Sequence, residues 1–214
     1  MQMNRRVSVA ALAALALLAV APLVAQAPKG WLARADRSTS ATDPDASGSI
    51  RFATMGAGFH AITPQAAVFW NPANTVNGNY SVKGTFTLMK PSSHTNYYGL
   101  VFGGSDLGGP RQTYLYFLVA QDGTWLLKRR EGTATEDVAP RALNAAVKKP
   151  DAKGQSVNAL EVRVATGKTD YLVNGTLVHS TPRTGRAAQT DGLYGIRVNH
   201  MLDVQVDGFA LSKP

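Results

Sequence analysis

Four histidines and fourteen acidic residues are the side chains of this chain that could ligate a metal ion or move a proton. The histidines are dispersed along the sequence at His60, His94, His179 and His200. Their spacing matches no metal signature such as His-Glu-x-x-His, so the sequence predicts no metal site and no cofactor. No Gly-x-Ser-x-Gly turn is present to hold a nucleophilic serine. We expect His94 and His200 to lie at loop mouths, where they could contact a ligand.

The acidic residues show no pair with the spacing that hydrolysis of a glycosidic bond requires. Asp203 and Asp207 share a face of an expected strand, but four residues of about 3.3 Å each place their Cα atoms about 13 Å apart. The carboxyl pairs of glycosidases are separated by roughly 5 to 9.5 Å. Asp106 lies in a glycine-rich loop and could join loop carbonyl groups around a structural calcium ion, although one carboxylate offers few of the oxygen ligands that calcium needs.

A set of aromatic and polar residues is the main candidate for binding chemistry. Sugars bind proteins by stacking their C–H faces on aromatic rings while polar side chains bond the hydroxyl groups. Strand alternation and loop position select the following candidates on outward faces and nearby loops: Tyr97, Tyr114, Tyr116, Trp125, Arg129, Arg163, His60, Trp70, His94 and His200. The competing interpretation is that these aromatic rings cover a sheet or pack beneath loops.

The elements that position these side chains are β-strands, and the clearest of them lie between residues 158 and 180. Apolar residues from Leu160 to Val164 alternate with charged ones, which is the pattern of a half-buried strand. Farther on, Asn174-Gly175 connects two short apolar runs. This dipeptide is the strongest short sequence signal for a hairpin, because a type I′ turn needs a positive φ at both central residues. The block therefore predicts a three-stranded antiparallel meander.

Most of the remaining chain shows the same pattern of short alternating segments separated by turn residues. About a dozen strands are expected, among them Tyr80–Met89, Tyr97–Phe102, Tyr114–Val119 and Leu202–Phe209. Residues 141–147 are expected to form one or two helical turns. A single twisted sheet of a dozen strands tends to curl or split. The sequence therefore predicts an all-β fold, a two-sheet antiparallel β-sandwich of the jelly-roll type.

The N-terminal residues differ in composition from the rest of the chain. Arg5 and Arg6 precede an apolar run that ends in Ala25-Gln26-Ala27, the pattern of a signal peptide and its cleavage site. An uncleaved membrane anchor is the alternative, because the run approaches the length that spans a bilayer. Cleavage predicts an exported protein, periplasmic or extracellular, without membrane contact. The expected division of the chain is a signal peptide at residues 1–27, a lead-in strand and polar loop at 28–49, and the β-sandwich at 50–214.

Composition narrows the class of protein further. The 214 residues are enough for one well-buried domain, and the absence of cysteine excludes disulfides and thiolate metal sites. The formal net charge is +8, but the basic residues are scattered along the chain. Adjacent ones such as Lys128 and Arg129 point to opposite faces of a strand, so we expect no nucleic-acid partner. The sequence gives no indication of the oligomeric state.

Several segments together resemble the concanavalin A-like jelly rolls: Tyr98–Phe102, Tyr114–Val119, Asp122–Trp125, Gly192–Gly195 and Val204–Phe209. Over residues 50–212 the chain is similar to laminin G-like domains and to secreted bacterial domains grouped with keto-disaccharide hydrolases. The resemblance implies the fold more than the function, because such domains include lectins, glycoside hydrolases and adhesion modules. The Glu-x-Asp-x-x-Glu acids that retaining glucanases of this superfamily carry are missing from the sequence.

Three functions are compatible with these features. The first is an exported carbohydrate-binding module without catalysis, whose partner is a glycan or oligosaccharide. The second is a glycoside-processing enzyme resembling the keto-disaccharide hydrolases, and the third is a structural or adhesion domain with no small-molecule site. An exposed groove carrying Trp125, Tyr116 and Arg129 would favour the first. A dry pocket with a carboxylate beside His60, His94 or His200 and a shifted pKa would favour the second, and a flat polar concave sheet would leave the third.

Overall fold

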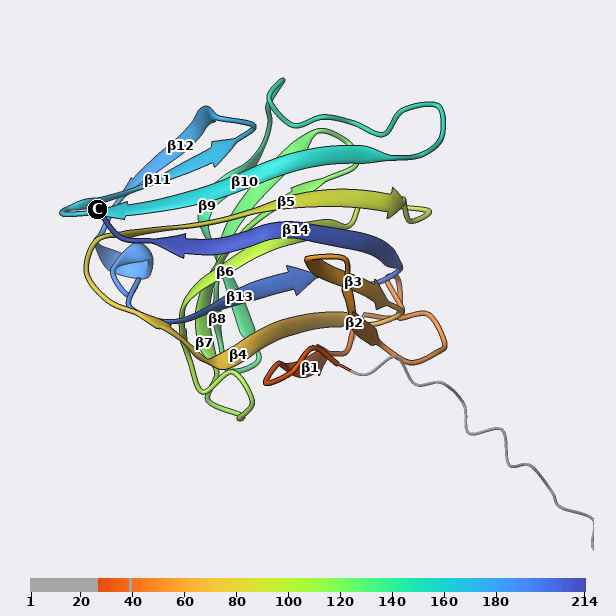
Figure 1. Cartoon of the computed structure of the whole chain (residues 1–214), viewed down its shortest axis with the longest axis horizontal. Helices are drawn as coiled ribbons and strands as arrows, with labels where there is room; N and C mark the ends of the chain where they lie inside the picture. The colour runs from red at the N-terminus through yellow and green to blue at the C-terminus, as the bar shows by residue number, and fades with distance from the viewer. Residues whose placement is uncertain (1–26, 39) are drawn as a thin grey trace, which may run out of the picture.

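The computed structural model describes residues 27–38 and 40–214, which form two packed seven-stranded β-sheets (Figure 1). The first sheet has the strand order β1-β4-β13-β6-β7-β8-β9, and the second has the order β12-β11-β10-β5-β14-β3-β2. The strands of the first sheet are β1 (Leu32–Asp36), β4 (Ala66–Val76), β6 (Tyr97–Ser105), β7 (Thr113–Ala120), β8 (Thr124–Glu131), β9 (Ala134–Leu143) and β13 (Gly192–Val198). The strands of the second sheet are β2 (Arg51–Met55), β3 (Gly58–Thr63), β5 (Tyr80–Lys90), β10 (Ser156–Ala165), β11 (Lys168–Val173), β12 (Thr176–Pro182) and β14 (Leu202–Ser212). A short 3₁₀ helix, η1 (Gly185–Ala187), precedes β13.

All strand pairings in the described residues are antiparallel, so the predicted two-sheet antiparallel β-sandwich is confirmed. In Figure 1, β10, β5 and β14 of the second sheet lie in front of β6, β7 and β8 of the first sheet. No helix within the described residues is long and apolar enough to cross a membrane. The predicted signal peptide lies outside the described residues, apart from its last residue.

The main core lies between the two sheets and follows the alternation that the sequence predicts. Leu115, Phe117 and Val119 of β7 are fully buried there. Leu160 and Val162 of β10 belong to the same buried cluster from the opposite sheet. Burying one side chain of this size contributes about 1.5 to 3 kcal/mol. This layer of apolar side chains therefore supplies the driving force that holds the two sheets together.

The meander predicted between residues 158 and 180 is formed by β10, β11 and β12. Its turn residues Asn174 and Gly175 have φ values of 50° and 80°, the positive values that a type I′ turn requires. The side chain of Asn174 also donates a hydrogen bond of 2.8 Å to the carbonyl oxygen of Ala146, which holds the segment between β9 and β10. The helical turns expected at residues 141–147 are wrong, because the first of these residues pair with β8 as the end of β9.

The first sheet is strongly curved. The hydroxyl group of Tyr114 on β7 donates a hydrogen bond of 3.0 Å to the carboxylate of Asp36 on β1, although three strands separate β7 from β1 in the sheet. In a flat sheet with about 4.8 Å between strands, β1 and β7 would lie about 19 Å apart. The sheet therefore bends over the face that points away from the second sheet. We call this the concave face, and its curvature gathers side chains from distant strands.

Candidate functional site

Two residues predicted to contact a ligand instead lie on the inner face of the first sheet. Trp125 pairs with Val119, and Arg129 pairs with Leu115, in the register of β7 and β8. Directly paired residues point to the same side of a sheet, so both side chains face the second sheet. Trp125 is 4% exposed and packs against Phe117 in the main core. The outward orientation predicted for Trp125 and Arg129 is therefore wrong. The expected alternation in β8 was displaced by one residue, and such a displacement exchanges the side chains of the two faces.

Two other predicted residues lie on the outer face of the second sheet. The Nε2 atom of His60 on β3 is 2.6 Å from Oδ1 of Asp203 on β14. Arg163 on β10 forms an ion pair of 2.8 Å with Glu161 at the surface. Packed sheets are about 10 Å apart, so the sandwich separates both residues from the concave face. His60 and Arg163 therefore share no site with the predicted tyrosines.

Trp70 and Tyr97 lie on the concave face, but both rings are buried. Trp70 packs beneath the loop between β6 and β7, where a Cβ atom on Gly108 would lie 3.5 Å from its ring. The hydroxyl group of Tyr97 lies 2.9 Å from Oγ1 of Thr124 and accepts a hydrogen bond of 3.2 Å from Arg141. These contacts agree with the competing interpretation, in which the aromatic rings pack beneath loops and neighbouring side chains.

Tyr114 and Tyr116 lie beside charged residues at the centre of the concave face. Nη1 of Arg197 donates a hydrogen bond of 2.7 Å to the hydroxyl group of Tyr114 and a second one to Asp36. The guanidinium group of Arg197 also lies over the ring of Tyr116, 5.2 Å from its centroid. From β8, Nη2 of Arg130 lies 3.8 Å from Oδ1 of Asp36. Nε of Arg34 on β1 lies 3.7 Å from the same oxygen, so three arginines and a tyrosine hydroxyl surround one buried carboxylate.

Arg197 and Arg130 keep the carboxylate of Asp36 ionised. Burial by itself would raise the pKa of Asp36, but the charge and hydrogen bond of Arg197 and the charge of Arg130 outweigh it and hold that pKa below its usual range. Burial raises the pKa of the Tyr114 hydroxyl, so this group stays protonated at neutral pH. Three guanidinium groups facing one carboxylate leave the cluster with an excess of positive charge.

A polar cavity of about 380 Å³ opens beside this cluster. Its walls come from the segment 37–45, the turn after β13 and the side chains of the concave face, and they include Asp36, Asp43, Tyr116, Arg130, Arg197 and His200. The volume lies within the range of about 300 to 1,000 Å³ that is typical of small-molecule sites. Charged groups of both signs and an aromatic side chain therefore line a space of the size that binds small ligands.

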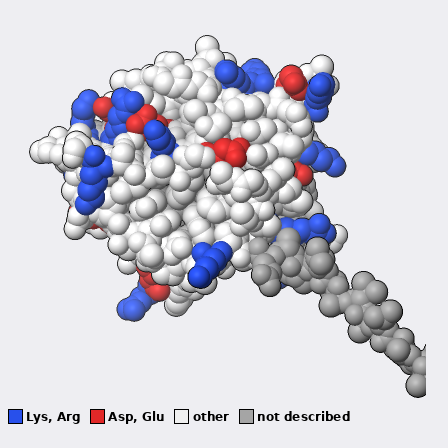
Figure 2. All heavy atoms as spheres, viewed as in Figure 1, with Lys and Arg blue, Asp and Glu red and all other residues white. Residues whose placement is uncertain are grey.

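The outer face of the second sheet is a weaker candidate for ligand binding than the polar cavity. A groove of about 360 Å³ lies there, and three of its lining residues are Gly84, Gly175 and Gly208. Around it, Lys and Arg side chains form separate groups, several of them beside Asp or Glu, with uncharged surface between them (Figure 2). The polar cavity of the concave face is therefore the better candidate site.

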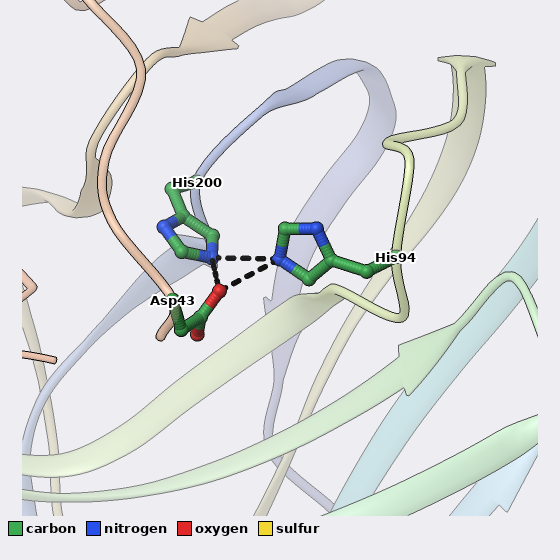
Figure 3. A group of neighbouring side chains, drawn as sticks. All are labelled: Asp43, His94 and His200. Carbon is green, nitrogen blue, oxygen red and sulfur yellow. Dashed lines mark hydrogen bonds and ion pairs between the residues drawn. The ribbon is translucent and has the colours of Figure 1, made fainter. Parts of the chain in front are cut away.

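His94 and His200, separated by 106 residues, meet at Asp43, a residue that lines the polar cavity (Figure 3). The Nε2 atoms of His94 and His200 lie 2.8 Å and 3.1 Å from Oδ1 of Asp43 and 3.3 Å from each other. At its other ring nitrogen, Nδ1 of His200 lies 3.2 Å from Oδ1 of Asp45. The sequence suggested both histidines as loop-mouth candidates but not their contact with each other or with these acids.

Comparison with known proteins identifies the fold. No family model and no curated protein matches the chain, but many solved structures do. The carbohydrate-binding module CBM66 from Bacillus subtilis has a TM-score of 0.60 at 11% identity, covering 86% of this chain and 96% of that one. A Bacillus subtilis protein of unknown function with a galectin-like fold has a TM-score of 0.58 at 16% identity, covering 86% and 89%. The fold is a concanavalin A-like jelly roll. A Bacteroides ovatus mixed-linkage glucan GH16 protein in complex with a G4G4G3G product has a TM-score of 0.55 at 9% identity, covering 83% of this chain and 92% of that chain.

The sequence predicted Tyr116 and His200 of the cavity, but not Asp36, Arg130 and Arg197. Arg197 lies between Ile196 and Val198, and a lone charge in an apolar strand is costly to bury unless a partner compensates it. That isolated charge was the available signal in the sequence. Asp36, its partner, lies in the segment that we expected to precede the jelly roll, yet β1 pairs with β4 inside the first sheet.

Proposed function

We propose that this protein is an exported carbohydrate-binding module without catalysis, and that the polar cavity of the concave face binds the glycan. The observation that carries the proposal is the set of charged groups held in place around the cavity: Arg197, Arg130 and Asp36. Sugars present closely spaced hydroxyl groups, which both donate and accept hydrogen bonds. Each hydrogen bond to a charged group contributes about 1.5 to 3 kcal/mol.

In this proposal the cavity recognises hydroxyl groups more than the apolar face of a sugar. Tyr114 is fully buried, and Arg197 already lies over the ring of Tyr116. No ring of this pair is therefore free for stacking, which sets the cavity apart from an aromatic platform. Because Asp36 and Tyr114 already fix the orientation of Arg197, little ordering of side chains is needed when the ligand binds.

The similar structures support the class of ligand. One is named as a carbohydrate-binding module, and another was solved with an oligosaccharide product. Their sequence identities of 11% and 9% carry no residue assignments to this chain, so the cavity itself is the basis for the proposed site.

A glycan array, followed by calorimetric titration with the best glycan, tests the proposal. Arg130→Met removes a charged group of the cavity, and we expect affinity to fall about 10- to 150-fold, the equivalent of 1.5 to 3 kcal/mol. Arg163→Met, on the outer face of the other sheet, is the matched control and should leave affinity unchanged. Equal affinities for the two variants would place the site elsewhere, and no binding to any glycan would contradict the proposed function. Export is tested separately by sequencing the N-terminus of the secreted protein, with cleavage expected near residue 27.

A glycoside-processing enzyme is the second candidate, because carboxylates lie beside two histidines at the cavity. Asp43 contacts His94 and His200, and Asp45 contacts His200. Such groups could exchange protons with a bound glycoside. Incubating the glycans of the array with the protein and measuring released sugars separates the candidates: turnover that Asp43→Asn abolishes would support the enzyme. If the protein shows neither binding nor turnover, the interpretation that remains is a structural or adhesion domain.

A further inference from the structure

We propose that Asp43, His94 and His200 form a binding site for a divalent transition-metal ion, with Zn²⁺ as the ion to test. The three side chains come from three separate parts of the chain, and Figure 3 shows their ligand atoms converging on one point. Imidazole nitrogen with one carboxylate oxygen is a donor set that zinc binds, whereas calcium and magnesium take oxygen ligands. This inference does not depend on the proposed sugar binding.

The distances between the three atoms fit a shared ion. Two nitrogens that each lie about 2.05 Å from a tetrahedral zinc ion are about 3.3 Å apart. The Nε2 atoms of His94 and His200 are 3.3 Å apart, and they lie 2.8 Å and 3.1 Å from Oδ1 of Asp43. A point about 2.05 Å from all three atoms exists about 1 Å off the plane that they define, so small side-chain rotations suffice to complete the geometry.

When both histidines are neutral, hydrogen bonds alone do not satisfy this arrangement. Each Nε2 atom needs a hydrogen of its own to bond the carboxylate of Asp43, and these two hydrogens then crowd together between the histidines. A neutral His200 has a single hydrogen, yet it faces Asp43 at Nε2 and Asp45 at Nδ1. An ion bound to both Nε2 atoms removes both conflicts, because His200 then keeps its hydrogen on Nδ1 for Asp45. A carboxylate behind a metal-binding histidine is the usual outer contact of such sites.

The surrounding structure holds the ligands in position and leaves a path to solvent. His200 is 5% exposed and lies in the turn between β13 and β14, where Oγ1 of Thr63 donates a hydrogen bond of 2.7 Å to the carbonyl oxygen of Asn199. The side chains of His94 and Asp43 are 40% and 50% exposed, so an ion can enter from that side. Three protein ligands leave the fourth position of a tetrahedral ion to water, the arrangement of zinc sites that keep an open position.

Titration of untagged, chelator-treated protein with Zn²⁺ in a calorimeter tests the site, with Co²⁺ as a spectroscopic substitute whose visible absorption reports its coordination. We expect one Zn²⁺ per chain. Asp43→Ala and His94→Ala should each weaken binding at least about tenfold, the lower end of what even an outer-contact substitution costs. Both residues are exposed, so these variants should fold, which circular dichroism checks. His60→Ala is the matched control, since His60 also pairs with an aspartate but belongs to no group of three ligating side chains within the described residues.

Several outcomes would overturn the inference. The first is that the wild-type protein does not bind one Zn²⁺ per chain. The second is that Asp43→Ala and His94→Ala bind Zn²⁺ as tightly as the wild type does. An equal loss of affinity in His60→Ala would mean that surface histidines bind the ion without a built site. Asp45→Asn adds an independent readout: we expect a 10- to 100-fold loss of Zn²⁺ affinity, because a neutral amide replaces the carboxylate behind His200.

Discussion

Replacing Asp36 with asparagine is a direct perturbation of the centre of the concave face. The substitution keeps the shape of the side chain but removes the charge that compensates Arg197, which is 7% exposed. Asp36 accepts hydrogen bonds from Arg197 and Tyr114 and lies 3.8 Å from Arg130. The variant therefore leaves the guanidinium groups of Arg34, Arg130 and Arg197 without this carboxylate.

The expected loss of unfolding free energy is about 3 to 5 kcal/mol, the usual cost of removing one partner of a buried ion pair. Because the pKa of Asp36 is held below its usual range, its contribution is fully present above the unfolded-state pKa, near 3.8, and is lost as the pH falls through the lower folded-state pKa. The wild type and the Asp36→Asn variant should therefore differ most near pH 7 and approach each other in acid.

Urea denaturation followed by tryptophan fluorescence measures this difference. Asp137→Asn is the control: it breaks an ion pair with Lys128 at 3.1 Å in which Asp137 is largely exposed, so it should cost at most about 1 kcal/mol. The double variant Asp36→Asn/Arg197→Met should be more stable than Asp36→Asn alone, because no uncompensated charge stays buried at Arg197. A loss for Asp36→Asn no larger than that of the control would refute the reasoning.

Three further substitutions test other parts of the structure. Trp125→Ala should cost about 3 to 5 kcal/mol in urea denaturation, since it empties part of the main core, and the folded fraction should keep its glycan affinity in calorimetry. Burial raises the pKa of Tyr171 to about 12, so the wild type should lose stability between pH 10 and 12 as the unfolded state ionises, and Tyr171→Phe should lose less in an alkaline denaturation series. Asn174→Ala should lower the midpoint of thermal unfolding more than Asn174→Gly, because φ at this position is 50° and glycine tolerates that value.

The fold was predictable because one physical rule repeats along the chain. A strand that faces the core on one side must carry apolar residues at every second position, and β7 and β10 follow this rule at Leu115, Phe117, Leu160 and Val162. The turn at Asn174 is equally local, since the backbone conformation that it requires is available to few residues. Neither feature depends on knowing which distant segments meet.

The site was harder to predict because it depends on register and curvature. In β8 the residues from Trp125 to Leu127 are all apolar and those from Lys128 to Glu131 are all charged, so the alternation that would set the inward face is absent. The register of β8 with β7 decides which side chains face inward. In this register Trp125 and Arg129 point toward the second sheet, while Arg130 faces Asp36. The contact between His94 and His200 likewise needs two loops 106 residues apart to meet.

Charge explains why the segment 36–45 completes the concave face. The strands and turns beneath it supply positive or neutral groups, among them Arg130, Arg197 and His200, while the segment supplies Asp36, Asp43 and Asp45. Most of the described side chains between residues 37 and 45, which exclude residue 39, are exposed, so apolar burial contributes little to holding them in place. Ion pairs and hydrogen bonds must do so, and those in contact with buried residues are weakly screened by salt. The same acidic side chains therefore both dock the segment and line the cavity, which is why a sequence division that excludes residues 28–49 from the sandwich also misses the site.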